Sequence, residues 1–289
     1  MKLIVNADDF GLCREVNRAV QQAHRHGILT SASLMVTGSA ATEAIEIAKD
    51  NPGLRVGLHI VLGCGRSALK AEQIPHLVDC QGAFPRSAFR VGLRYWFDRA
   101  AKDELARELR AQFELFAASG LPLSHVDGHM DLHVHPTVFD LLVPLLREFK
   151  AGGFRLPQEP LWAALHAGSI RAISRTPASA ILWILSRRCE RRLAQCKLAM
   201  PRRSYGLLHS GSMSEQYLLS LLPRINHESA EIYFHPTTAE RVEQFGPNPG
   251  DLAALLSPAV RRVIDQRGME LTTYAGIHRL PETQWAHGC

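Results

Sequence analysis

The chain has 289 residues, 46% of them hydrophobic, which is enough to bury a core in one large α/β domain or two small ones. Its longest apolar run, Ala180–Leu185, is far shorter than the roughly 20 residues of a membrane-spanning helix, and Met1–Val5 is too short for a signal-peptide core. The net charge is +5, and the six cysteines form neither a CxxC pair nor a zinc-ribbon spacing, so we predict a cytoplasmic protein with reduced thiols.

Apolar patterns alternate between strand and helix along the chain. Short apolar runs predict strands at Leu3–Val5, Ser31–Thr37, Arg55–Val61, Ser124–Asp127, Gly153–Leu156, Glu231–His235 and Glu270–Tyr274. Helical spacing predicts helices at Glu15–His26, Ala40–Asp50, Asp103–Ser119, Phe139–Lys150 and Asp251–Arg267. Such alternation is typical of a mainly parallel sheet wrapped by helices. We predict a single α/β domain over residues 1–289, a (β/α) barrel that is complete or incomplete, rather than an open doubly wound sheet.

The segment 161–212 stands out as a helical, basic insertion within this domain. Between Arg171 and Arg203, nine residues are Arg or Lys and one is acidic, and Ala180–Leu185 includes Trp183. An apolar helix beside an arginine-rich stretch suits the surface of an anionic membrane, although a buried helix with a solvated basic end fits the same pattern. No nucleic-acid-binding motif accompanies the basic residues, so no nucleic-acid partner is expected.

Polar residues that end the apolar strands are the candidates for a functional site. Functional groups gather at the carboxyl ends of parallel strands in both barrels and open α/β sheets. Asp8 and Asp9 follow the first strand, and His59 and His235 each end another. A further cluster follows the strand near Ser124–Asp127.

In this cluster, polar and apolar residues alternate. The polar positions are His125, Asp127, His129, Asp131, His133 and His135. In an extended chain all of them would face one side. Imidazoles and carboxylates in this number are costly to bury unless they are paired or hold a cation, so a divalent metal ion is the economical explanation.

Each candidate also has a purely structural interpretation. Asp8 or Asp9 could cap the following helix, and a single histidine such as His59 is more often a packing residue than a ligand. The joint pattern favours a catalytic metal site, because one Asp and two His suit Zn²⁺ or another divalent ion and leave positions open. Adjacent aspartates would then supply both a ligand and a general base.

Three motifs make the chain resemble the YdjC-like (ChbG-like) carbohydrate deacetylases. They are Asn6–Gly11 (NADDFG), Gly57–His59 (GLH), and His125–His129 (HVDGH) with His133–His135 (HVH). The resemblance runs over nearly the whole chain. It implies hydrolysis of an N-acetyl group from an amino sugar, giving a free amine and acetate.

The resemblance also implies roles for particular residues. Asp9, His59 and His129 would hold one divalent metal ion, Zn or Mg, while Asp8 would be the general base and His235 the general acid or oxyanion partner. Three candidates remain. Arg155 would orient the base or the sugar, or else form a surface salt bridge, and His133 would hydrogen-bond near the metal ligands and hold them in place. The role of His209 stays open.

The insertion, together with Arg155–Glu159 and Glu231–Pro236, makes the chain similar to the hopanoid-biosynthesis-associated branch of this family (HpnK). That branch implies an N-acetylglucosaminyl hopanoid lipid as substrate, reached by peripheral contact on the inner face of the cytoplasmic membrane. Two alternatives stay open: a deacetylase of chitooligosaccharides such as diacetylchitobiose, and a non-catalytic, metal-dependent scaffold in lipid biosynthesis. The scaffold explains less, because a ligand site needs only one of the adjacent aspartates. The sequence is also compatible with a homo-oligomer.

Overall fold

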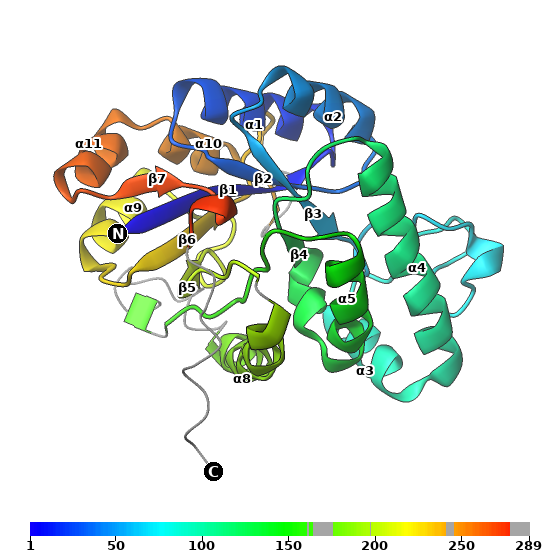
Figure 1. Ribbon diagram of the computed structural model, residues 1–289. Helices are drawn as coiled ribbons and strands as arrows, with labels where there is room; N and C mark the ends of the chain where they lie inside the picture. Colours follow the sequence, from blue (N-terminus) through cyan, green and yellow to red (C-terminus); the bar gives the residue numbers. More distant parts are fainter. Residues whose placement is uncertain (161, 164–175, 197, 241–245, 278–289) are drawn as a thin grey trace, which may run out of the picture.

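The structure is a computed structural model that describes residues 1–160, 162–163, 176–196, 198–240 and 246–277 (Figure 1). Its centre is a seven-stranded sheet with the order β4-β3-β2-β1-β6-β5, in which β7 also pairs with β1. The strands are β1 (Lys2–Phe10), β2 (Ser31–Leu34), β3 (Arg55–Ile60), β4 (Val126–Gly128), β5 (Arg203–Tyr205), β6 (Ser229–Phe234) and β7 (Glu270–Thr272). All the pairings between these strands are parallel, as predicted.

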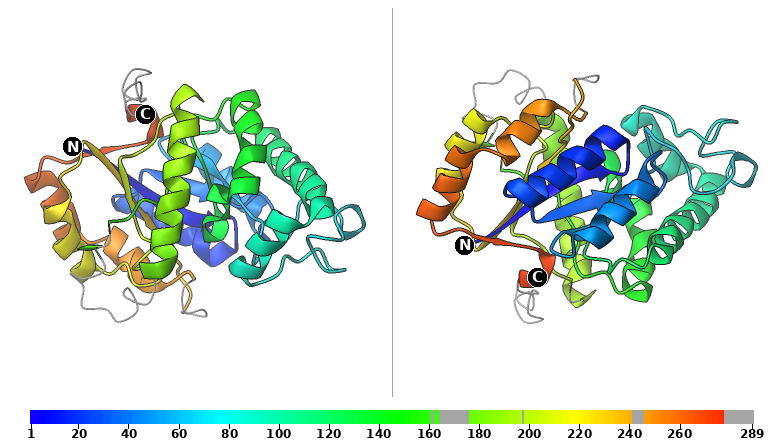
Figure 2. Two further views of the ribbon diagram at one scale, coloured as in Figure 1. Left: turned by 90° about the horizontal axis from the view of Figure 1, so that it is seen from below. Right: turned by 90° about the horizontal axis from the view of Figure 1, so that it is seen from above.

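Helices wrap the outside of the curled sheet (Figures 1 and 2). The α-helices are α1 (Arg14–His26), α2 (Ala41–Asp50), α3 (Ala88–Phe97), α4 (Arg99–Ala118), α5 (Pro136–Glu148), α8 (Thr176–Leu193), α9 (Glu215–Leu221), α10 (Pro249–Leu255) and α11 (Pro258–Gln266). Short 3₁₀ helices are η1 (Ala71–Gln73), η2 (His129–Val134), η3 (Ala194–Cys196), η4 (Leu222–Arg224) and η5 (Tyr274–Gly276). A single α/β domain of barrel-like form is therefore confirmed.

The barrel is incomplete between β4 and β5. There the parallel pairing continues only as isolated bridges, from Val126 to Phe154 and from Gly153 to Ala199. The predicted strand Gly153–Leu156 is wrong as a regular strand, because this chain makes single bridges and then reaches Pro157, which has no N–H to donate.

One predicted helix, Asp251–Arg267, is wrong because the chain forms two helices, α10 and α11. Pro258 has no N–H to continue α10 and occupies the first turn of α11. The Ser257 hydroxyl accepts hydrogen bonds from the backbone N–H groups of Ala259 and Val260 and so caps the new helix. The sequence prediction also missed α3, α9 and β5.

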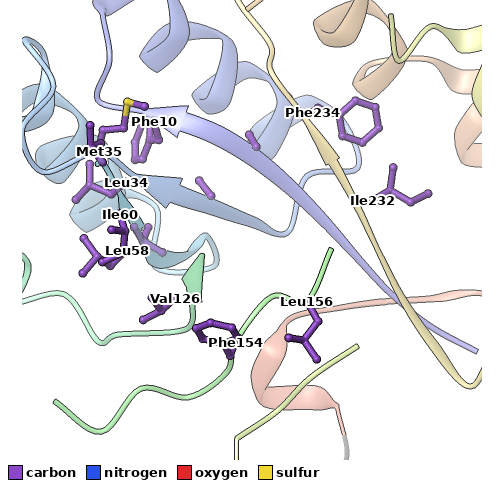
Figure 3. Close-up of a cluster of buried hydrophobic side chains, with 14 of the residues drawn as sticks. Phe10, Leu34, Met35, Leu58, Ile60, Val126, Phe154, Leu156, Ile232 and Phe234 are labelled. Atoms are coloured by element: carbon purple, nitrogen blue, oxygen red, sulfur yellow. The ribbon is translucent and has the colours of Figure 1, made fainter. Parts of the chain in front are cut away.

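The apolar core fixes the carboxyl ends of the strands (Figure 3). Phe10, Leu58, Val126 and Phe234, from four different strands, are fully buried. His59 lies between Leu58 and Ile60 in β3, so its side chain projects to the opposite face from theirs. Packing of the apolar face therefore holds the polar face in place.

The segment 161–212 supplies both a helix and part of the sheet. It contains α8 and also β5, which pairs with β6. Arg188 and Arg192 of α8 form ion pairs with Asp140 of α5, while Ile181 remains exposed. Residues 161, 164–175 and 197 of this segment lie outside the described residues. No helix in the described ranges is long and apolar enough to cross a membrane.

Candidate active site

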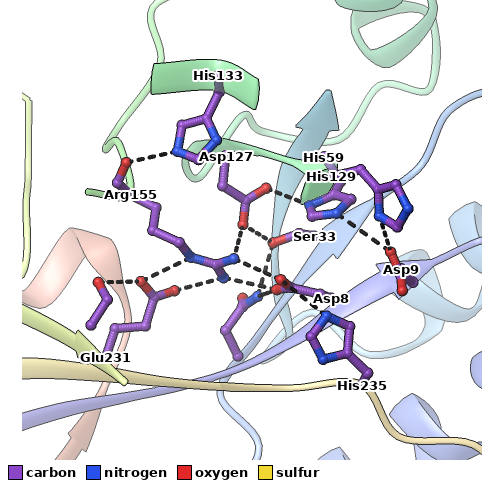
Figure 4. A network of polar contacts seen from close by, with 12 residues as sticks. Asp8, Asp9, Ser33, His59, Asp127, His129, His133, Arg155, Glu231 and His235 are labelled. Atoms are coloured by element: carbon purple, nitrogen blue, oxygen red, sulfur yellow. Dashed lines mark hydrogen bonds and ion pairs between the residues drawn. The ribbon is translucent and has the colours of Figure 1, made fainter. Parts of the chain in front are cut away.

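The strand ends identified in the sequence meet at one edge of the sheet (Figure 4). Asp9 Oδ1 lies 3.0 Å from His129 Nδ1 and 3.4 Å from His59 Nε2. On the other side of the site, Asp8 Oδ2 lies 3.9 Å from His235 Nε2. The structure thus brings together the residues proposed as ligands, base and acid.

An irregularity in β1 allows its two adjacent aspartates to serve the same site. Successive side chains of a regular strand point to opposite faces. Here the pairing with β2 shifts between Ala7 and Phe10, and Asp9 has a φ of 61°. Both carboxylates therefore line one cavity. Neither aspartate caps α1, which begins after Cys13.

The prediction that the polar residues from 125 to 135 share one face of an extended chain is wrong. Only Val126–Gly128 is a strand, and η2 follows it, with Met130 and Asp131 at φ values of 58° and 56°. This turn sends His129 towards Asp9, whereas His135 packs edge-on against Trp96 at 5.8 Å between ring centroids. The cluster is divided between the site and its surroundings.

The residues behind the site hold its histidines in place. Asp127 Oδ1 lies 2.8 Å from His59 Nδ1, so the carboxylate fixes Nδ1 as the protonated nitrogen and leaves Nε2 free towards Asp9. His125 Nε2 lies 3.0 Å from the Ser33 hydroxyl, and its ring stacks on Tyr274. Burial lowers the pKa of His125 to about 4, which keeps it neutral.

Asp9, His59 and His129 have the character of a metal site. Their ligand atoms all lie within 4.8 Å of one another. Asp9 Oδ1 and His59 Nε2 are buried, and neither has a hydrogen-bond partner among the described residues. Burial alone would raise the pKa of Asp9, but His129 and His59 hold that pKa well below its ordinary value. One carboxylate and two imidazoles suit Zn²⁺ and related divalent ions.

In a second group of potential ligands, Asp8, His59 and Asp127, both carboxylates already form ion pairs with Arg155. Arg155 is 1% exposed and donates two hydrogen bonds, of 2.7 and 2.8 Å, to the Asp8 carboxylate. The same guanidinium lies 2.9 Å from Asp127 Oδ2. We therefore place the metal-type site at Asp9, His59 and His129. The alternative of a surface salt bridge for Arg155 is wrong.

Glu231 of β6 completes the surroundings of Arg155. Its carboxylate accepts hydrogen bonds of 3.1 and 3.0 Å from Arg155 and one of 2.9 Å from the Tyr274 hydroxyl. Burial opposes a charge at Arg155, yet Asp127, Asp8 and Glu231 raise the pKa of Arg155 well above its ordinary value. His133 adds a contact of 3.1 Å from Nε2 to the Arg155 carbonyl oxygen. The guanidinium is thus a fixed cation behind Asp8.

A cavity of about 440 Å³ opens in front of these groups, within the ~300–1,000 Å³ range of small-molecule sites. Its polar lining includes Asp8, Asp9, His59, Cys64, His129, Asp131, Ser210, Tyr233 and His235. Its apolar wall includes Ala88, Met130, Ala178, Leu182 and Leu207. The predicted residue His209 is buried against the Tyr217 ring and is not among the residues that line this cavity.

Tyr233 is a site residue that sequence reasoning missed. It is 4% exposed, and its buried hydroxyl has no hydrogen-bond partner within the described ranges. The Arg155 guanidinium lies 4.3 Å from the centre of its ring. The alternation of Glu231 and Tyr233 in β6 with His235 directly after it could have revealed Tyr233, since alternate residues of an extended chain share a face.

Asp131 also lines the cavity. Burial raises the pKa of Asp131 to about 7, and Asp8 and Asp127 act in the same direction. The alternating pattern of the sequence places Asp131 in the polar cluster but predicts no separate role for it. Its left-handed backbone conformation is what turns its side chain towards the cavity after β4.

Comparison with known proteins places the chain in a family. A family model described as YdjC-like protein matches residues 2–266. A carbohydrate deacetylase of Geobacillus stearothermophilus is 31% identical over 96% of this chain and 98% of its own length. A chitooligosaccharide deacetylase of Yersinia enterocolitica is 30% identical over 94% of this chain and 98% of its own. A carbohydrate deacetylase of Brevibacillus brevis is 41% identical, over 52% of this chain and 57% of its own length.

A solved structure from Enterococcus faecalis V583, of a protein named for cellobiose-phosphate cleavage, shares the fold. It has a TM-score of 0.71 at 24% identity and covers 94% of this chain and 97% of its own. The resemblance inferred from the three motifs is confirmed by the family model. Because that model covers most of the chain, and a relative with 31% identity spans nearly all of it, the chain belongs to the YdjC-like family.

Proposed function

We propose that this chain is a metal-dependent N-deacetylase that acts on an amino sugar. The observation that carries the proposal is one carboxylate beyond the metal-type triad: Asp9 faces both histidines, while Asp8 is held separately by Arg155. A site that only bound a metal would need no such second carboxylate. A scaffold role therefore explains less of the geometry than hydrolysis does.

Each side chain has a distinct task in amide hydrolysis. A divalent ion held by Asp9, His59 and His129 would act as a Lewis acid on the amide carbonyl and would lower the pKa of water. Asp8, fixed by Arg155, accepts the proton of the attacking water. His235 donates a proton to the leaving nitrogen as the C–N bond breaks, which yields a free amine and acetate.

The finer proposal concerns the substrate. We infer that the substrate is an N-acetylglucosaminyl hopanoid lipid, in line with the sequence resemblance. Two features support a lipid: Leu182 and Met130 form part of an apolar cavity wall, and Ile181 and Ile184 of α8 are exposed. Peripheral contact with an anionic membrane through the segment 161–212 belongs to this proposal. The name of the Yersinia enterocolitica relative favours the second candidate, a chitooligosaccharide.

Mass spectrometry of the metal-loaded protein separates these substrates. We would incubate it separately with N-acetylglucosaminyl bacteriohopanetetrol and with diacetylchitobiose and follow the loss of one acetyl group. Loss from the hopanoid alone would support the lipid substrate, and loss from the chitobiose alone would support the soluble one. Loss from neither, with metal bound, would refute the proposed deacetylase on these sugars.

Replacing Asp127 with Asn should weaken metal binding by about 10–100-fold, because the carboxylate that fixes the His59 tautomer is lost. Isothermal titration with Zn²⁺ measures this effect. An unchanged affinity would contradict the supporting role of Asp127.

Replacing Tyr233 with Phe should raise KM about fivefold with little change in the free energy of unfolding. We propose that its hydroxyl, which has no partner in the described part of the chain, bonds to the sugar, and one such bond contributes about 1 kcal/mol. Tyr205→Phe is the matched control, because Tyr205 is equally buried but does not line the cavity. Equal KM values for the two variants would remove Tyr233 from the binding site.

A further inference from the structure

Helix α3 presents an apolar stripe to solvent. Its inner side is anchored by Val91 and Tyr95, which are 2% and 1% exposed. Its outer side carries four large apolar residues, here called the α3 face: Phe89 (76% exposed), Leu93 (45%), Trp96 (49%) and Phe97 (75%). Spacings of three and four residues place them side by side on the helix. The helix is therefore amphipathic, with a second apolar side that the core does not use.

The concentration of such residues is unusual for the surface of a soluble domain. Elsewhere in the described part of the chain, the exposed large hydrophobic residues are Leu115, Met130, Ile181 and Ile184. A single exposed residue such as Leu115 needs no explanation, but a contiguous apolar patch marks an interaction site. The α3 face is such a patch.

The charges around this patch identify its partner. Arg86, Arg90 and Arg94 are exposed in or beside α3, and the chain has no Asp or Glu between residues 80 and 97. Phe, Leu and Trp on a helix flanked by Arg are typical of helices that lie in the headgroup region of an anionic bilayer. Anionic headgroups would supply counter-charges to these arginines, which a purely apolar protein surface would not.

The position of α3 relative to the cavity gives the patch a purpose. Ala88 of α3 and Leu182 of α8 both line the cavity, so both helices border it. Figure 2 shows α3 and α8 on the same face of the molecule in the view from below. On α8, Ile181 and Ile184 are 60% and 69% exposed. Met130 both lines the cavity and is 41% exposed.

We infer that the α3 face, assisted by Ile181 and Ile184, inserts into the headgroup region of an anionic lipid bilayer and sets the cavity against the membrane surface. This inference deepens the membrane contact of the proposed function and rests on it, but it locates the main anchor outside the segment 161–212. The sugar of a lipid would then reach the metal-type site while its apolar part stays in the bilayer.

Vesicle co-sedimentation of the full chain tests the inference. We expect binding to vesicles that contain phosphatidylglycerol, with weaker binding to pure phosphatidylcholine and in high salt. The double variant Phe89→Ala/Phe97→Ala should bind the anionic vesicles at least about tenfold more weakly, since exposed apolar surface that the bilayer would bury is removed. Leu115→Ala is the matched control, because Leu115 is an exposed leucine of α4 outside the α3 face.

The outcomes are separable from those of the deacetylase proposal. Failure of the chain to bind anionic vesicles, or equal binding by the double variant, would overturn the inference. If sedimentation velocity without lipid shows a dimer that the double variant loses, the α3 face is an interface between copies of this chain, and the lipid proposal is wrong. Vesicle binding without loss of acetyl from either sugar would refute the deacetylase function alone.

Discussion

Asp8→Asn should lower kcat by about 10²–10⁴-fold while leaving the affinity for Zn²⁺ nearly unchanged. This range is the usual contribution of a positioned general base. Asp8 is bound by Arg155 and lies 3.9 Å from His235. The two histidines of the proposed metal site, His59 and His129, contact Asp9 instead. Steady-state formation of the deacetylated sugar from its N-acetylated substrate and isothermal titration with Zn²⁺ give the two readouts.

Asp9→Asn is the matched control for this experiment, because it makes the same chemical change one residue further along β1. Asp9 Oδ1 is the atom that both histidines approach, so its replacement should weaken Zn²⁺ binding and turnover together. If Asp8→Asn instead removes the metal, or Asp9→Asn leaves the metal affinity intact, the division of roles between the two aspartates is wrong.

Arg155→Met should lower the free energy of unfolding by about 3–5 kcal/mol, the scale on which a broken buried ion pair destabilises a protein. The substitution leaves Asp8, Asp127 and Glu231 without their shared cation in a buried site. Urea denaturation of the metal-free protein measures the loss. The loss in the free energy of unfolding should become smaller as the pH falls. Buried carboxylates without a cation have raised pKa values in the folded state, so they take up protons and lose their unfavourable charge.

Two further variants show whether charge causes this loss. Arg110→Met removes an exposed pair with Glu148, whose two side chains are 46% and 48% exposed, and should change stability by about 0–1 kcal/mol. Glu231→Gln in the Arg155→Met background should restore part of the lost stability, because one unpaired carboxylate is neutralised. A similar loss in Arg155→Met and Arg110→Met would mean that the buried network contributes little.

Local patterns in the sequence were sufficient for the framework of the fold. The stripe Val16, Ala19, Val20 and Ala23 predicted α1, and all of these residues are buried in the structure. Polar residues at the ends of apolar strands predicted which side chains would meet, because parallel strands bring their carboxyl ends to one edge. Asp8, Asp9, His59 and His235 could thus be found one strand at a time.

Tertiary structure decided the features that depend on long-range packing. Arg155 and Asp8 are 147 residues apart in the sequence, and no local period indicates that they pair. The alternation from His125 to His135 predicted one face, but two left-handed residues, Met130 and Asp131, turn the chain and separate His129 from His135.

The amino-acid sequence by itself determined the alternating strands and helices and the residues at the strand ends, since these depend on neighbours along the chain. Packing determined the rest: which buried charges share Arg155, which carboxylate faces the histidines, and which side of α3 is left exposed. Ion pairs and burial depend on groups that only the folded chain brings together, so spacing along the sequence carries no record of them.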